Sequence, residues 1–233
     1  MTSDLSSMRR GDYCPSMDSS LFHGISEQEL SELNGIFTSV ALEANDYLVH
    51  QQSPATHVYN IMSGTLLVER IGLSGRRQIL AFLFPGDFFG FAHNQSFEFS
   101  VQSLTTANVA AFKRKEFFNI CDHLPNLKHN MEEITTNVLF HAFDQVFALG
   151  QKKAHERICF LLMQLIQRQP GATDEQLVLP MTRRDIADYL GLTNETVSRA
   201  FSKLIKMEII AIDNIYNIKI LNLDELKHLA SPD

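Results

Sequence analysis

Residues 182–206 constrain the fold of this chain more than any other stretch, because they combine two helix starts with a glycine turn. Thr182 and Asp185 have the spacing of a capping box at the start of a first helix. Gly191 can adopt the positive φ of a tight turn, and Thr193 can cap a second helix. The stretch therefore predicts two short helices joined by a sharp turn.

Both predicted helices carry an apolar stripe. In the second helix the apolar residues recur at i, i+3, i+4 and i+7, which places them on one buried face: Val197, Ala200, Phe201 and Leu204. The first helix has a matching stripe: Ile186, Ala187 and Leu190. This pattern is typical of a helix-turn-helix, whose second helix enters the DNA major groove. An ordinary helical hairpin with a solvated polar face is the alternative, and the agreement of caps, spacing and both stripes favours DNA binding.

The charge of the chain is unevenly distributed. The 233 residues, enough for two domains, carry a net charge of −7. Residues 151–233 hold 11 basic and 11 acidic side chains, so the excess of negative charge lies in residues 1–150. Within 182–206 there are five basic and three acidic residues. We therefore expect DNA binding through a small, locally basic footprint whose affinity falls as salt rises.

Several other protein classes are not expected from the sequence. No apolar run approaches the length of a membrane helix, and residues 1–20 lack the apolar core of a secretory signal. Cys14, Cys121 and Cys159 are few and widely spaced, which indicates a reducing cytoplasm rather than a disulfide framework. Paired catalytic carboxylates, an HExxH motif, a nucleophile elbow and a phosphate loop were not found, so we expect no enzyme.

The rest of the chain predicts a β-rich region, a long helix and a winged domain. Residues 26–37 have helical spacing, and β-rich runs separated by turns then predict a small jelly roll: 47–49, 58–62, 65–71, 78–84, 97–104 and 109–112. A short helix is expected at 115–122 and a longer one at 153–168. The runs 209–212 and 215–221 flank an Asp213-Asn214 turn and predict a β-hairpin wing; a short strand at 177–179 and a closing helix at 223–229 complete this domain.

The long helix predicted at 126–149 carries a seam of apolar residues. The seam residues Leu139, Ala142, Val146 and Leu149 step by 3, 4 and 3, which is the period of a coiled coil. Ile134, Val138 and Phe143 widen the stripe. We expect this stripe to pair two copies of the chain, since a helix-turn-helix usually binds two half-sites. The alternative is a helix buried against its own domain. The expected α+β organisation is a flexible tail (1–20), a β-roll (21–122), a dimerisation helix (123–150) and a winged helix-turn-helix (151–233).

This order of elements resembles the CRP/FNR family of bacterial transcription regulators. The resemblance is strongest in residues 73–78, 84–91 and 185–199, and it is closest to the FixK-type members, which are linked to low-oxygen and nitrogen-oxide metabolism. It implies a β-roll similar to a cyclic-nucleotide-binding domain. It also implies a homodimer in the cytoplasm that binds an inverted repeat in double-stranded DNA and recruits or blocks RNA polymerase.

The resemblance also assigns roles on the second helix. FNR-like members carry Glu-x-x-Ser-Arg there and read a TTGAT-type half-site, which here implies Glu195, Ser198 and Arg199. An arginine can bind guanine O6 and N7 bidentately, and a glutamate can accept from a cytosine amino group. Asn194 stands where the cyclic-AMP-binding members carry a second arginine, which favours the FNR-like half-site. Three residues are better placed for phosphates, which position a protein without specifying sequence: Thr182, Arg183 and Thr193.

The β-roll departs from the ligand-binding members of the family. Cyclic-nucleotide members need a Glu after the conserved Gly and an Arg-Ser pair, whereas this chain has Phe91 after Gly90, and Phe99-Ser100 in place of the pair. Iron–sulfur members need several N-terminal cysteines. We therefore predict no cyclic nucleotide, metal or cluster. Two readings stay open: a regulator without a small-molecule ligand, and a member gated by haem or another small ligand, for which Cys14 and nine histidines are available.

Overall fold

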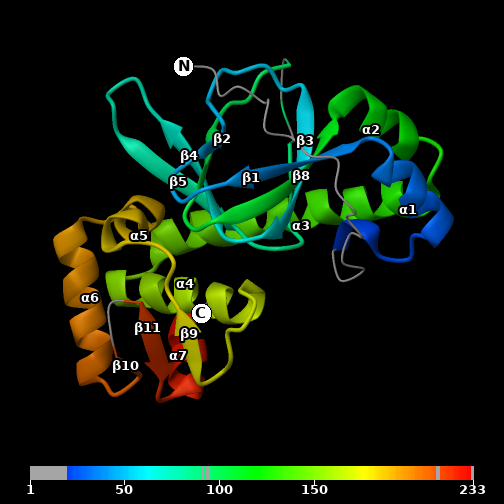
Figure 1. The fold of residues 1–233 in the computed structure, drawn as a ribbon. Coiled ribbons are helices and arrows are strands. Elements are labelled where there is room, and N and C mark those ends of the chain that lie inside the picture. Colours follow the sequence, from blue (N-terminus) through cyan, green and yellow to red (C-terminus); the bar gives the residue numbers. More distant parts are fainter. Residues whose placement is uncertain (1–19, 91, 93–94, 214–215, 232–233) are drawn as a thin grey trace. The chain divides into compact units, whose positions relative to one another are not determined.

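The structure is a computed structural model that describes residues 20–90, 92, 95–213 and 216–231. It shows two compact units (Figure 1). The first holds the described residues up to Arg70 together with Ala81–Val138; the second holds Ile71–Leu80 together with residues from Leu139 onward. The predictions made for residues 1–19, Phe91 and Asn214 lie outside the described residues.

Two four-stranded sheets form the β-roll, as predicted, and most of their residues belong to the first unit. One sheet has the order β1-β8-β3-β6 and contains β1 Phe37–Leu42, β8 Ala107–Lys113, β3 His57–Ser63 and β6 Phe88–Phe89. The other has the order β2-β7-β4-β5 and contains β2 Tyr47–Val49, β7 Ser100–Ser103, β4 Leu66–Ile71 and β5 Arg77–Leu83. Strands β1 and β3 pair antiparallel with β8, and β2 and β4 pair antiparallel with β7.

Apolar side chains from alternate strand positions fill the interior of the roll. Ile61, Leu66, Val101 and Val109 are buried in one cluster, as period-two patterning requires. Gly64 connects β3 to β4 with a φ of +85°, and a Cβ at this position would lie 2.5 Å from the Cβ of Ala107. Only glycine therefore allows this turn to approach β8 so closely.

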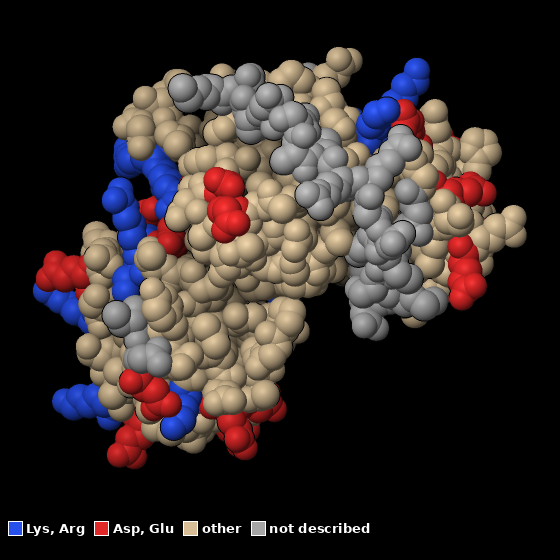
Figure 2. Space-filling model, in the orientation of Figure 1, with Lys and Arg blue, Asp and Glu red and all other residues tan. Residues whose placement is uncertain are grey.

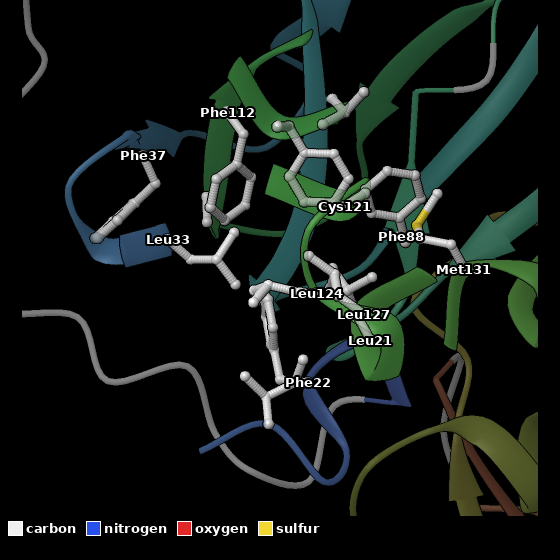
Figure 3. Packing of buried hydrophobic residues seen from close by; sticks show 14 of the residues in the cluster. Leu21, Phe22, Leu33, Phe37, Phe88, Phe112, Cys121, Leu124, Leu127 and Met131 are labelled. Atoms are coloured by element: carbon white, nitrogen blue, oxygen red, sulfur yellow. The ribbon is translucent and has the colours of Figure 1, made fainter. Parts of the chain in front are cut away.

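A second apolar cluster lies where helices pack on the outer face of the roll (Figure 3). The helical elements that contribute to it are η2 Ser20–Phe22, α1 Glu27–Asn34, α2 Arg114–Cys121 and the first half of α3 Pro125–Gln151. The ring of Phe117 lies 5.5 Å from that of Phe88 and 5.4 Å from that of Phe112. The Asn130 amide donates to the carbonyls of Leu21 and His23, at 2.9 and 2.8 Å, and so fixes the start of the described chain on α3.

The long helix α3 changes character along its length. Its first half buries Leu127, Met131 and Ile134 in the outer cluster. From Val138 onward it exposes a series of large apolar side chains: Val138, Leu139, Phe140, Phe143, Val146 and Phe147. Among the described residues, no helix combines the length and apolar character needed to cross a membrane.

The second unit is a winged helix-turn-helix, as predicted. Its elements are α4 Ala154–Arg168, β9 Gln176–Val178, α5 Arg183–Leu190, α6 Asn194–Lys206, β10 Ile210–Ile212, β11 Asn217–Ile220 and α7 Leu223–Ala230. The three strands form a small antiparallel sheet in the order β10-β11-β9. Helix α4 packs against both α6 and α7, and Figure 1 shows α6 at the edge of this unit.

Two strands were not predicted from the sequence. The helical spacing at 26–37 continues past the end of α1 at Asn34, and Phe37 instead begins β1. The spacing is misleading because Leu33 and Phe37 bury their side chains in the same cluster from different elements. Strand β6 has two residues, Phe88 and Phe89, which is too short to give a periodic pattern.

Candidate nucleic-acid interface

Both helices of the helix-turn-helix begin with the predicted caps. The Thr182 hydroxyl accepts the backbone N–H of Asp185 at 3.1 Å, and the Asp185 carboxylate accepts the backbone N–H of Thr182 at 2.9 Å. The Thr193 hydroxyl accepts the N–H of Thr196 at 3.1 Å. These bonds satisfy N–H groups that a helix start leaves without partners, so the start of each helix is fixed locally.

Gly191 closes the turn between the two helices, as predicted. Its φ of +62° lies in the left-handed region, and its N–H donates to the carbonyl of Ala187. The second helix then leans on the first with its apolar stripe. Val197 and Leu204 are fully buried, and Ala200 and Phe201 nearly so. The opposite face of α6 is left in solvent.

The residues that the resemblance assigns to base reading lie together on this solvent face. Glu195, Ser198 and Arg199 are exposed, and Glu195 and Arg199 form an ion pair one turn apart, with side chains 72% and 78% exposed. Ser198 donates to the carbonyl of Asn194 at 3.0 Å. The side chains of Asn194 and Thr193 are exposed at the start of the helix, where the helix dipole favours an anion. The exposed face of α6 therefore presents two hydrogen-bond acceptors, the Glu195 carboxylate and the Ser198 hydroxyl, beside the Arg199 guanidinium.

Arg183 is placed differently from the prediction. Its guanidinium lies 3.4 Å from the ring centroid of Phe201, and burial lowers its pKa. Stacking on an aromatic face is a strong use of a guanidinium, and it ties the first turn of α5 to the buried face of α6. The neighbouring Arg184 is exposed and is the freer cation for a phosphate. The sequence does not show which of these two adjacent arginines stacks on Phe201 and which faces solvent. That depends on the side of α5 from which each side chain projects.

Charged side chains of both signs surround α6. The exposed cations of this unit include Arg184, Arg199, Lys203 and Lys206, and Figure 2 shows Lys and Arg side chains along the side where α6 lies, with acidic groups among them. Lys219 in the wing pairs with Asp213 at 3.0 Å. The basic surface is thus local, in keeping with the charge distribution of the sequence.

A buried histidine contacts α6 from the neighbouring helix α4. His155 is buried at the start of α4, and the Lys203 ammonium lies 3.0 Å from its Nε2. Burial of the imidazole, and then the charge of Lys203, lower the pKa of His155, while Glu156 acts in the opposite direction. The lowered pKa favours the neutral imidazole, whose ring nitrogen can accept from the Lys203 ammonium. This contact could not be predicted from sequence patterns, because the two residues are 48 positions apart.

The predicted dimerisation residues divide into two groups. Ile134 is 8% exposed and packs in the outer cluster of the first unit, so it is unavailable to a partner and the prediction for it is corrected. Leu149 is partly buried. Val138, Leu139, Ala142 and Val146 are exposed, as a surface for a second chain requires. Phe143, which was predicted to widen the stripe, is exposed with them, and so are Phe140 and Phe147, which were not assigned to it.

Phe99 and Ser100, which the resemblance aligns with the Arg-Ser pair of the cyclic-nucleotide members, make their contacts inside the β-roll. The ring of Phe99 lies 5.3 Å from that of Phe89 and 6.5 Å from that of Phe97. The hydroxyl of the buried Ser100 accepts the N–H of Gln51 at 2.9 Å. A phosphate buried here would meet aromatic rings in place of the arginine that such an anion requires, so these residues do not fit a cyclic nucleotide.

Two cysteines are placed by the structure, and both are buried. Cys121 lies in the outer cluster of the first unit and Cys159 in α4 of the second. Burial raises the pKa of each thiol to about 12, so neither is activated as a thiolate. Within the described ranges, no three His, Cys, Asp or Glu side chains are grouped in a way that could hold a metal ion.

Comparisons with known proteins agree with this architecture. Residues 39–123 match the family model of the cyclic nucleotide-binding domain, and residues 156–229 match that of the Crp-like helix-turn-helix domain. The nitrogen fixation regulation protein FixK of Bradyrhizobium diazoefficiens is 32% identical over 202 residues, which cover 85% of each chain. The chain belongs to the CRP/FNR family. Its relatives place it in the FixK-like branch, as the resemblance predicted.

Two further comparisons extend this assignment. The transcriptional activatory protein AadR of Rhodopseudomonas palustris is 36% identical to this CRP/FNR member over 71% of the chain and 70% of its own length. The solved structure of FixK2 from Bradyrhizobium japonicum superposes with a TM-score of 0.79 at 31% identity, covering 85% of this chain and 99% of that one. The protein is therefore a CRP/FNR-type transcriptional regulator with a helix-turn-helix DNA-binding domain.

Proposed function

We propose that this CRP/FNR protein acts as a homodimer that reads an inverted repeat of TTGAT-like half-sites with Glu195, Ser198 and Arg199. The observation that supports this most directly is the division of α6 into two faces. Its apolar face is buried, while these three polar side chains are exposed on the other face. A helix held rigid from behind can present donors and acceptors to base edges at little entropic cost.

The chemistry of these side chains matches the proposed half-site. Arg199 would donate two hydrogen bonds to guanine O6 and N7, and Glu195 would accept from a cytosine amino group. In the free protein Glu195 already pairs with Arg199, which orients the guanidinium along the exposed face before DNA arrives. Ser198 would contact a neighbouring base. Thr182, Thr193, Asn194 and Arg184 surround this face and would bind phosphates.

The exposed apolar stripe on α3 supports the homodimer. Leu139, Phe143 and Val146 are separated by four and three residues and are 52%, 58% and 69% exposed. This spacing is that of a coiled-coil seam, and so many large apolar side chains in one place indicate a protein interface. The proposed biological role is control of low-oxygen or nitrogen-oxide genes through contact with RNA polymerase. Its low-oxygen part is in keeping with a relative named anaerobic regulatory protein, and other relatives are named nitrogen fixation regulation proteins.

A fluorescence titration tests the proposal. A labelled duplex with an inverted TTGAT repeat is compared with a scrambled duplex of the same composition, each at several salt concentrations. The wild-type chain is expected to bind the repeat about 10³-fold or more tightly. Arg199→Ala should lower discrimination at one base pair by about 1–3 kcal/mol, whereas the control Arg184→Ala should weaken both duplexes alike and reduce the salt slope by about 0.9. Equal affinity of the wild-type chain for both duplexes would refute the proposal.

A further inference from the structure

The end of α5, the first helix of the helix-turn-helix, is held by side chains from other segments of the second unit. The Gln78 amide donates to the carbonyls of Asp188 and Tyr189, at 2.6 and 3.2 Å. The Gln145 amide donates to the same Tyr189 carbonyl at 3.0 Å. The last carbonyls of a helix have no partner inside it, so these bonds satisfy groups that would otherwise need water or a glycine cap. Gln78 lies in the 71–80 hairpin and Gln145 in α3.

Arg157 on α4 completes this arrangement. Its guanidinium donates to the carbonyl of Leu190 at the end of α5 (2.9 Å). It also donates to the carbonyl of Leu149 near the end of α3 (2.7 Å) and to that of Lys152 between α3 and α4 (2.9 Å). A guanidinium offers five donors in a fixed plane, so its bonds to three carbonyls restrict the geometry between α3 and α5.

A partly buried ion pair fastens the same helix on a second side. The Arg77 guanidinium lies 2.6 Å from the Asp185 carboxylate and 3.1 Å from that of Asp188. The side chains of all three residues are between 11% and 23% exposed, so water screens them little. Asp185 uses its other oxygen to cap α5, which links the hairpin directly to the start of the helix-turn-helix.

We infer that Gln145 and Arg157 are positioning residues that fix α6 relative to α3, that Gln78 supports them by holding the same end of α5 from the hairpin, and that together they set the half-site spacing that the dimer accepts. The inference rests on the proposed function, in which two α3 helices define the dimer axis. Helices α5 and α6 share one apolar core, so a constraint on the end of α5 is also a constraint on α6. One additional base pair moves a half-site by about 3.4 Å and rotates it by about 35°. A loosely held helix-turn-helix would tolerate such a change better.

A spacer series measures this property. The full-length double variant Gln78→Met/Gln145→Met keeps the length of both side chains and removes both donors. Its affinity is measured for an inverted repeat with the preferred spacer, for repeats one base pair longer or shorter, and for a single half-site. Loss of the three bonds that these two amides donate to α5 in each chain should lower the ratio of preferred to altered spacing by about ten-fold, while single half-site affinity stays unchanged. Gln167→Met, an exposed glutamine on α4, is the matched control and should leave every affinity unchanged.

The outcomes separate the two proposals. A wild-type chain that binds the repeat no better than a scrambled duplex would refute the proposed function. The positioning role alone would be refuted if the wild-type chain had a sharp spacing optimum and the double variant kept the same ratio of affinities for preferred and altered spacing. This holds even if the melting temperature of the double variant fell. If the double variant does not fold, Gln145→Met provides the same comparison, with an expected loss of about three-fold in the ratio.

Discussion

The exposed stripe on α3 makes dimer strength sensitive to one side chain. Val146 is 69% exposed and lies at the centre of the stripe. Full burial of such a side chain is worth about 1.5–3 kcal/mol, so covering Val146 in both copies contributes about 2–4 kcal/mol. Val146→Glu removes this contribution and places a carboxylate opposite its own copy. The dimer dissociation constant should therefore rise by at least about thirty-fold.

Sedimentation equilibrium over a range of protein concentrations measures this change. His141→Glu is the matched control, because His141 is exposed on α3 but lies on the opposite side of the helix from the stripe. The control should dimerise like the wild-type chain, and both variants should keep the circular dichroism of the folded protein. A dissociation constant for Val146→Glu within about two-fold of the wild-type value would refute the assignment of the stripe to the dimer interface.

Three further predictions concern the stability of the second unit. Gly191→Ala should cost about 1–2 kcal/mol in urea unfolding, because φ is +62° while the new Cβ meets only ordinary contacts; an unchanged midpoint would contradict this. Asp185→Ala removes the cap of α5 and one carboxylate partner of Arg77, so it should lower the free energy of unfolding by about 1–3 kcal/mol. Burial raises the pKa of Asp185, but its hydrogen bonds to Thr182 and Arg77 outweigh burial and hold the pKa low; the variant loses these bonds. The expected result is a lower urea midpoint at an unchanged m-value. The pKa of His155 is lower in the folded chain than in the unfolded chain, so the unfolded chain takes up a proton at a higher pH. The free energy of unfolding therefore has its full value above pH 6.5 and decreases as the pH falls below 6.5. His155→Gln should reduce the drop in melting temperature between pH 7.5 and 5.5, and an identical drop in the variant would contradict the assignment.

The sequence predicted the helix-turn-helix closely because its signals are local. Caps, turn glycine and apolar stripes all act within a few residues, so the structure confirms the capping roles predicted for Thr182 and Thr193 and the turn role predicted for Gly191. The long helix was predicted for the same reason. The sequence could not show which residues of its apolar seam pack in the chain's own core and which remain exposed for a partner. Ile134 and Val146 are both β-branched apolar residues, and they differ only in what packs on them.

The contacts that were missed are those between distant positions. Arg77 and Asp185 are 108 residues apart, and the Arg157 contact with Leu190 spans 33 residues. The periodic patterns used to predict helices and strands contain no information about contacts between residues so far apart in the sequence. The stacking of Arg183 on Phe201 was missed because an arginine at a helix start is equally suited to a phosphate or to an aromatic face, and only the crossing of α5 and α6 decides between them.

A double-mutant cycle between Arg199→Ala and a single G·C to A·T change in the half-site tests base reading by α6 most directly. Dissociation constants are measured for the four combinations of protein and duplex at one salt concentration. If Arg199 binds that guanine, the base change should cost the wild-type chain about 1–3 kcal/mol and the variant almost nothing. Additive effects of the two changes, at every guanine of the half-site, would contradict the account.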